Sequence, residues 1–201
     1  MLRLAYQDKS PSVPADTRIA PNAVVSGDVT VGHNCSIGFG AVLTAESGPI
    51  RIGDNCVVMD GAVLRGVRGN PLRIGDNVLI GPHAYLTGCT IEQNGFIATG
   101  ATIFNGAVVG ERAEVRINGI VHIRTRLLPD AVVPLGWIAV GDPAEILPPD
   151  AHERIWEIQK PLDFPRYVFG VERPEEGETM MPDVMRRYAG FLVRRHSGDS
   201  S

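Results

Sequence analysis

The chain carries an aliphatic side chain at nearly every sixth position over more than half of its length. The residues that keep this phase are Val13, Ile19, Val25, Val31, Ile37, Leu43, Ile52, Val58, Leu64, Ile74, Ile80, Leu86, Ile91, Ile97, Ile103, Val109, Val115, Val121, Leu127 and Val133. A period of six fits neither the repeat of an α-helix nor the two-residue alternation of a simple hairpin. It predicts an all-β solenoid, a parallel β-helix in which three short strands form each coil of about 18 residues.

A small residue stands two positions before most of these aliphatic residues, as at Ala23, Cys35, Ala62 and Ala101. Each six-residue unit also contains a Gly, Asn or Asp, the residue types that a turning chain favours. We therefore expect the aliphatic side chains to point inward and the small residues to lie at tight corners. Stacked coils then give roughly seven turns, each about 4.8 Å from the next.

The pattern divides the chain into three parts. We expect an N-terminal segment over residues 1–10, the β-helix over 11–148, and a C-terminal helical segment and tail over 149–201. Within the last part, residues 150–162 and 182–196 each place apolar residues on one helical face. Two α-helices are therefore predicted after the solenoid.

Two phase breaks interrupt the solenoid, from residue 43 to 52 and from 64 to 74. Both follow the third unit of a coil, so the pattern predicts two loops that leave the same edge. Loops on one edge of a solenoid often form its binding site. The second loop contains Arg65, Arg68 and Arg73, and arginines around a glycine-rich corner can bind a carboxylate or a phosphate.

Composition narrows the class of protein. The 201 residues are 44% hydrophobic and 21% charged, with a formal net charge of −4. This balance favours a folded core and disfavours nucleic-acid binding through bulk positive charge. The sequence has no apolar run long enough for a membrane span, and its first residues lack a signal-peptide core. We therefore expect a cytoplasmic protein with neither nucleic-acid nor membrane partners.

The six-residue units resemble those of the left-handed β-helix superfamily, which includes hexapeptide acyltransferases and γ-class carbonic anhydrases. Residues 50–66, 72–91, 98–110 and 140–146 are most similar, in order and in loop placement, to γ-carbonic-anhydrase-like proteins. The resemblance implies left-handed coils and a homotrimer with sites between subunits. The handedness rests on the resemblance, because periodicity alone does not define it.

The family holds a zinc ion with three histidines, and zinc lowers the pKa of a bound water. At the positions that match these histidines, this sequence has Arg65, Pro82 and Thr87, with His83 one residue beyond the second. Arginine, proline and threonine side chains do not supply three neutral nitrogen ligands. No metal site and no zinc cofactor are therefore expected, although a rearranged site that uses His83 or His122 stays open.

The coil register indicates which side chains share the vacated cleft. The residues just after the third aliphatic position form one column: Ser26, Thr44, Arg65, Thr87, Phe104 and His122. A second column holds Asp60, Pro82 and Thr99, and the resemblance implies that the two columns meet between subunits. We predict Arg65, His83 and Asp60 as catalytic residues, with substrate bound by Thr87, Tyr85, Arg68, Phe104 and His122.

Other interpretations of these residues remain open. Arg65 can instead form a structural salt bridge with Asp60 or with an acidic residue of a neighbouring subunit, and His83 and His122 can be packing residues at an interface. The first hypothesis is a cleft for a small anionic substrate, in which Arg65 anchors the anion and His83 moves a proton. The alternatives are an acyl-CoA-dependent transferase that uses acetyl-CoA and a non-catalytic trimeric scaffold, so whether the protein is a lyase, a transferase or no enzyme stays undecided.

Overall fold

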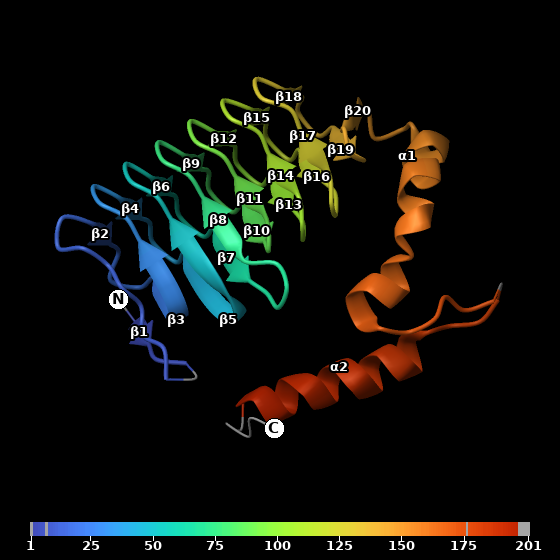
Figure 1. Ribbon diagram of the computed structural model, residues 1–201, viewed down its shortest axis with the longest axis horizontal. Helices are drawn as coiled ribbons and strands as arrows, with labels where there is room; N and C mark the ends of the chain where they lie inside the picture. The colour runs from blue at the N-terminus through green and yellow to red at the C-terminus, as the bar shows by residue number, and fades with distance from the viewer. Residues whose placement is uncertain (1, 7, 176, 197–201) are drawn as a thin grey trace. The chain divides into compact units, whose positions relative to one another are not determined.

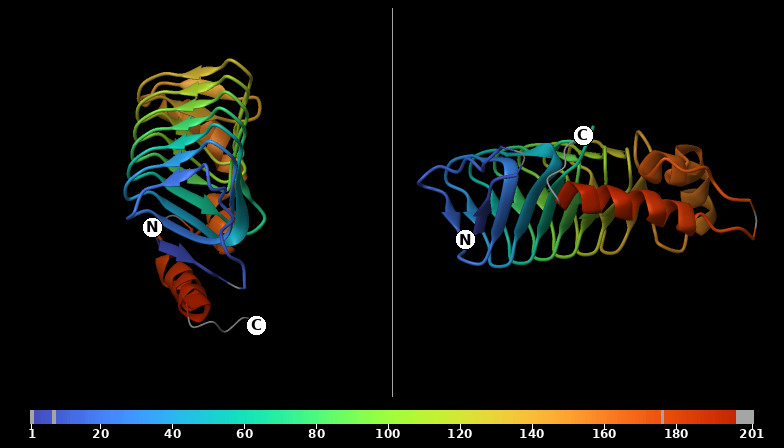
Figure 2. Two further views of the ribbon diagram at one scale, coloured as in Figure 1. Left: turned by 90° about the vertical axis from the view of Figure 1, so that its left-hand side faces the viewer. Right: turned by 90° about the horizontal axis from the view of Figure 1, so that it is seen from below.

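A computed structural model describes residues 2–6, 8–175 and 177–196. The chain forms two compact units, Met1–Ala151 and His152–Ser201. The first unit is a stack of coils, as the views of Figures 1 and 2 show. The left-handed β-helix predicted from the sequence is confirmed, and each coil before the last contributes short strands to three faces.

Face A is a parallel sheet of seven two-residue strands. Its members are β2 (Arg18–Ile19), β4 (Ser36–Ile37), β6 (Val57–Val58), β9 (Leu79–Ile80), β12 (Phe96–Ile97), β15 (Glu114–Val115) and β18 (Val132–Val133). In each pair the aliphatic residues face one another in register, as Ile37 does with Val58 and Val58 with Ile80.

Faces B and C belong to one thirteen-stranded sheet, because β3 (Val24–Val31) and β5 (Val42–Ile52) continue around the corner between them. Face B continues with β7 (Val63–Gly66), β10 (Tyr85–Thr87), β13 (Thr102–Ile103), β16 (Ile120–Val121) and β19 (Ile138–Val140). Face C continues with β8 (Leu72–Ile74), β11 (Thr90–Ile91), β14 (Val108–Val109) and β17 (Arg126–Leu127).

Different strands occupy the two ends of the stack. β1 (Leu2–Leu4) pairs parallel with β3 in the first coil. β20 (Glu145–Leu147) instead pairs antiparallel with β19 in the last coil. The parallel repeat therefore stops at residue 140 on face B.

The core is the column of inward aliphatic residues that the six-residue period predicts. Leu43, Leu64, Leu86 and Ile103 are fully buried and lie in register along face B. The small residues that precede them, such as Ala62, are also fully buried, so a larger side chain has no space there. The inward and outward assignments made from the sequence are confirmed at these positions.

Asparagine side chains connect successive coils at the corner between faces C and A. Asn34, Asn55, Asn77 and Asn94 all have positive φ, between 52° and 61°. Each amide nitrogen donates to the amide oxygen of the next asparagine, at 2.8 Å, 3.3 Å and 3.2 Å in turn. Asparagine tolerates the left-handed conformation better than most residues, so one residue type both makes the turn and joins the coils.

The second unit contains α1 (His152–Gln159), a 3₁₀ turn η1 (Lys160–Leu162), a π-helical turn η2 (Pro165–Phe169) and α2 (Met181–His196). The sequence predicted the two α-helices but not η2, whose Phe169 ring meets Phe164 and Tyr188 edge-on. Among the described residues, neither α-helix is long and apolar enough to cross a bilayer. The predicted tail over residues 197–201 lies outside the described part.

Candidate functional site

The predicted column on face B is present in the structure. Ser26 pairs with Thr44, Thr44 with Arg65, and Arg65 with Thr87 on the adjacent strands β3, β5, β7 and β10. Arg65 points outward, because it alternates along β7 with the buried Leu64 and Gly66. The column therefore places an arginine and a threonine on neighbouring strands, whose backbones lie about 4.8 Å apart.

Arg65 contacts another residue predicted for the site. Its Nη1 donates a hydrogen bond of 3.1 Å to the hydroxyl oxygen of Tyr85 on β10. Both side chains are half-buried. A phenol is neutral and the guanidinium has five N–H donors, so this hydrogen bond orients the arginine without neutralising its charge.

Thr87 has a partner that the sequence analysis missed. Its hydroxyl donates a hydrogen bond of 2.9 Å to Oδ1 of Asn105, and Thr87 is only 6% exposed. Asn105 directly follows Phe104 of the predicted column. Asparagine at a corner suggests only a turn residue, so the sequence carried no separate signal for this contact.

Phe104 and His122 close the column on the following coils. Their ring centroids are 6.2 Å apart, and the ring planes are inclined by 56°. Burial lowers the pKa of the His122 imidazole, because desolvation disfavours the charged form. The usual histidine value is about 6.5, so His122 is neutral at pH 7 and adds an uncharged, polar edge to the column.

Two of the predicted catalytic residues lie at the corner between faces A and B instead of on the column. Asp60 Oδ1 accepts a hydrogen bond of 2.7 Å from the backbone N–H of Phe39 one coil earlier. The backbone N–H of His83 donates to the carbonyl oxygen of Asp60 at 3.0 Å. His83 is exposed, with φ of 56°. Within one subunit, the predicted residues thus form two groups, at the A/B corner and on face B.

The two segments at the phase breaks meet at one corner, between faces B and C. The loop predicted between residues 43 and 52 is shorter in the structure, because residues 42–45 of β5 pair with β3 and β7, and residues 50–52 pair with β3 and β8. Between them the ladder is interrupted, and residues 46–49 stand opposite the single residue Asp28. The segment after β7 is a loop in which Val67 and Asn70 form a bridge. Arg68 lies exposed in this loop, and its backbone N–H donates to Ser47 Oγ at 2.9 Å.

Family models and a curated relative match large parts of this chain. The family model "Bacterial transferase hexapeptide (six repeats)" matches residues 10–45, and "Hexapeptide repeat of succinyl-transferase" matches residues 28–65 and 71–109. Gamma carbonic anhydrase 2, mitochondrial, of Arabidopsis thaliana is 35% identical over 146 residues, which are 70% of this chain and 50% of that protein. The chain is a γ-carbonic-anhydrase-like hexapeptide-repeat protein. It spans about half the length of the curated relatives it matches.

Solved structures support the same fold for this γ-carbonic-anhydrase-like protein. A provisionally named acetyltransferase of Bacillus cereus is 28% identical, with a TM-score of 0.65, over 80% of this chain and 91% of its own. A UDP-N-acetylglucosamine acyltransferase of Bacteroides fragilis is 14% identical, with a TM-score of 0.58, over 100% of this chain and 88% of its own. The second likeness concerns the fold alone.

The donor set of this γ-carbonic-anhydrase-like protein does not fit the zinc ion of the family it resembles. The matching residues are Arg65, Pro82 and Thr87; Arg65 donates a hydrogen bond to Tyr85, and Thr87 donates one to Asn105. A zinc ligand must instead offer a lone pair from nitrogen, sulfur or oxygen. Over residues 2–6, 8–175 and 177–196, no three His, Cys, Asp or Glu side chains lie close enough to hold a metal ion.

Proposed function

We propose that the face-B column of Arg65, Tyr85 and Thr87 binds a small carboxylate-like anion in a γ-carbonic-anhydrase-like protein that has lost the zinc hydration chemistry. The observation that carries this proposal is the outward, half-buried Arg65, which is oriented by the Tyr85 hydroxyl at 3.1 Å. Partial burial strengthens a charge-assisted hydrogen bond, because less water competes for the donor.

The geometry of the column supports an anion more than a neutral ligand. A guanidinium offers a planar pair of N–H groups that matches the two oxygens of a carboxylate. The polar side chains beside it, Tyr85 and Thr87, are neutral at pH 7 and can add polar contacts to a bound ligand. His122 stays uncharged at neutral pH because burial lowers its pKa. Arg65 would therefore anchor the anion and define its orientation.

We further propose that the cleft is completed by a second subunit of a homotrimer. The A/B corner exposes a row of apolar side chains, of which Leu135 is 61% and Phe39 55% exposed. Beside them lies a hollow of about 490 Å³ lined by Met59, Phe96 and Ile117 among others. Exposed apolar surface of this kind favours contact with another protein surface. A neighbouring copy whose A/B corner packed against face B would bring its His83 near Arg65.

Binding measurements with a matched pair of variants test the proposal. Arg65→Gln removes the anchoring charge, whereas Arg18→Gln removes an exposed arginine from β2 on face A. We expect bicarbonate, acetate or succinate to bind the natural protein and Arg18→Gln equally, and Arg65→Gln about tenfold or more weakly, as for loss of one charged hydrogen bond. Isothermal titration calorimetry measures this. Equal binding by all three proteins would contradict the role of Arg65.

The same preparation tests the trimer and the second candidate function. Light scattering is expected to give a mass three times the 21.6 kDa of the chain, and a monomer would contradict the shared cleft. An acyl-CoA-dependent transferase is the second candidate, because both matching family models describe transferase hexapeptides. Binding of acetyl-CoA without binding of small carboxylates would favour that candidate. A response to neither probe would favour a scaffold.

A further inference from the structure

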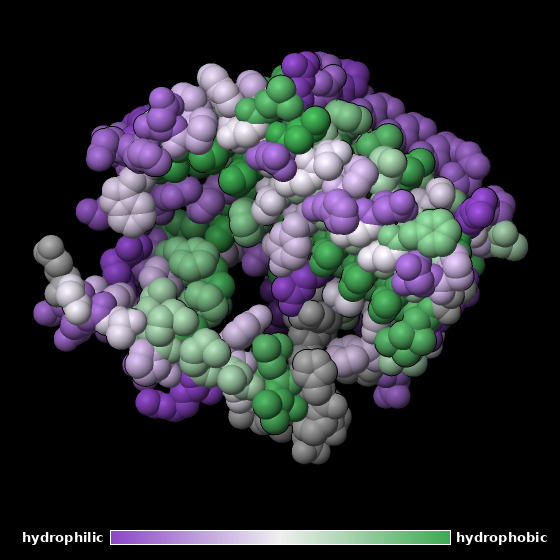
Figure 3. All heavy atoms as spheres, turned by 180° about the vertical axis from the view of Figure 1, so that it is seen from behind, coloured by the Kyte–Doolittle hydropathy of each residue, from purple (hydrophilic) through white to green (hydrophobic). Residues whose placement is uncertain are grey.

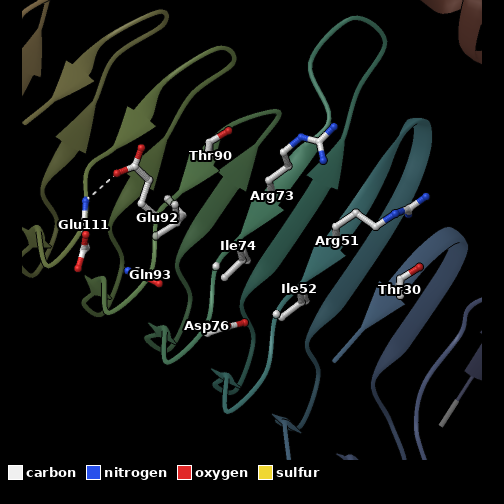
Figure 4. Close-up of a pocket in the computed structure, with 13 residues that line it drawn as sticks. Thr30, Arg51, Ile52, Arg73, Ile74, Asp76, Thr90, Glu92, Gln93 and Glu111 are labelled. Atoms are coloured by element: carbon white, nitrogen blue, oxygen red, sulfur yellow. Dashed lines mark hydrogen bonds between the residues drawn. The ribbon is translucent and has the colours of Figure 1, made fainter. Parts of the chain in front are cut away.

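Face C carries a second polar column, on a different side of the solenoid from Arg65. Thr30 pairs with Arg51, Arg51 with Arg73, and Arg73 with Thr90, on β3, β5, β8 and β11. We call these four residues the face-C column. Figure 4 shows that all four side chains project from their strands toward the same side. Two guanidinium groups therefore stand on directly paired residues, with a hydroxyl on each flank.

Paired arginines are an unfavourable arrangement, because like charges opposite each other on neighbouring strands repel. Arg51 is compensated: its Nη2 lies 2.7 Å from Oδ1 of Asp28, and its Nη1 donates to the carbonyl oxygens of Asp28 and Ile50 at 2.9 Å each. Arg73 is exposed and makes no side-chain hydrogen bond or ion pair with any residue that the structure describes. One positive charge of the pair is thus left without a counter-charge.

The column lines a groove with a volume of about 640 Å³. Its other side carries Asp76, Glu92 and Glu111 (Figure 4). Two of these carboxylates are engaged with the backbone. Asp76 Oδ1 accepts from the N–H of Asp54 at 2.8 Å, and Glu92 Oε2 accepts from the N–H of Glu111 at 3.0 Å. These hydrogen bonds hold Asp76 and Glu92 at the coil corners without removing their charge, and Glu111 is ion-paired with Arg112. An anion in the groove is therefore placed at the end that carries Arg51 and Arg73, away from the carboxylates.

We propose that this groove binds the phosphate or pyrophosphate group of a small molecule, held between Arg51 and Arg73 and flanked by the hydroxyls of Thr30 and Thr90. Neighbouring strands lie about 4.8 Å apart, so one tetrahedral anion can contact both paired residues. Its charge is matched by the Arg73 guanidinium, and its further oxygens can accept from those N–H groups of Arg51 that Asp28 and Ile50 do not use, whereas a single carboxylate is matched by one fork.

The surroundings of the column limit the size of the ligand. The four residues span three strand spacings, on the order of 14 Å, which suits one or two linked phosphates. Beyond them, the acidic side of the groove repels a longer polyanion, and the chain has a net charge of −4. The geometry therefore favours a small phosphorylated molecule over a nucleic acid. This site lies apart from the Arg65 column, so the two proposals can fail separately.

Calorimetric titration of the full chain with inorganic phosphate, pyrophosphate and acetate at low salt tests the proposal. Arg73→Gln removes the uncompensated charge, and Arg126→Gln is its matched control. Arg126 is exposed on the same face but pairs with Val108, and so has no arginine beside it. We expect pyrophosphate to bind the natural protein and Arg126→Gln equally, and Arg73→Gln about tenfold more weakly, in line with loss of a charged hydrogen bond. Acetate should bind this groove more weakly than pyrophosphate.

Thermal unfolding gives a second readout that a merely structural role of Arg73 would not produce. Without ligand, Arg73→Gln should unfold at the same or a higher temperature than the natural protein, because the repulsion with Arg51 is removed. Pyrophosphate should raise the unfolding temperature of the natural protein and of Arg126→Gln but not of Arg73→Gln. No binding of phosphate or pyrophosphate, equal binding by Arg73→Gln, or equal losses in both variants would overturn the proposal.

Discussion

Gly61 lies beneath the imidazole ring of His83, so a side chain at position 61 would collide with that ring. Gly61 has φ of 67°, and a Cβ added there would lie 2.5 Å from His83 Nδ1 and 2.6 Å from its Cε1. Gly136 has nearly the same φ, 68°, but a Cβ there would meet nothing within 4 Å. The two glycines therefore separate backbone strain from a side-chain clash.

We predict that Gly136→Ala lowers the free energy of unfolding by about 1 kcal/mol, the cost of a left-handed conformation with a Cβ. Gly61→Ala should cost more, because the His83 ring must also move. When His83 is already alanine, Gly61→Ala should lower the free energy of unfolding only as much as Gly136→Ala does. Urea denaturation measures all four values. Equal costs for both glycines in the natural background would show that the ring moves aside freely.

At the scale of residues, the period of six predicted which side chains face inward and which share a column. The pairing of Arg65 with Thr87 follows from that period and is confirmed by the strand register. The period does not define which atoms meet. The contacts of Arg65 with Tyr85 and of Thr87 with Asn105 depend on side-chain rotamers and on corner geometry. The phase break between residues 64 and 74 separates Arg51 from Arg73, so the six-residue period alone did not predict that these two residues pair.

At the scale of elements, the asparagine ladder joins four coils at one corner. Asn55 is in its middle, donating to Asn77 and accepting from Asn34. Asn118 has a similar φ of 57° but is not part of the ladder. Substitution by glycine keeps the left-handed conformation accessible at both positions, so it isolates the contribution of the amide hydrogen bonds.

We predict that Asn55→Gly lowers the free energy of unfolding by about 1 kcal/mol more than Asn118→Gly, as expected for loss of one or two exposed side-chain hydrogen bonds. Urea midpoints with an unchanged slope would measure this difference. Should the two variants lose the same stability, the ladder would be a consequence of the turn geometry and would not stabilise the coil stack.

The six-residue pattern did not predict the boundaries of all elements. The gap between residues 43 and 52 indicated a loop, because the period is lost there. In the structure β5 turns the corner within this gap: residues 42–45 pair on face B, residues 50–52 pair on face C, and residues 46–49 interrupt the ladder between them. Similarly, η2 was missed because a π-helical turn has no distinctive periodicity over five residues.

At the scale of the whole molecule, the division into two units predicts separate folding. All residues of the main buried cluster lie between Val13 and Ile146, within the first unit. A fragment ending at Ala151 therefore keeps the entire core of the solenoid. We predict that this fragment unfolds cooperatively in urea and retains the β-type circular dichroism of the solenoid. A fragment without a cooperative transition would show that the second unit is required for the fold.

The last coil of a parallel stack exposes unpaired backbone N–H and C=O groups, to which a coil of another molecule could add. Exposed strand edges of this kind promote end-to-end polymerisation of β proteins. Here β20 reverses direction and pairs antiparallel with β19. An incoming coil from another molecule would meet a strand of the wrong polarity at this position. On face B, the three residues Glu145–Leu147 therefore cover the edge to which a further parallel coil would have to add.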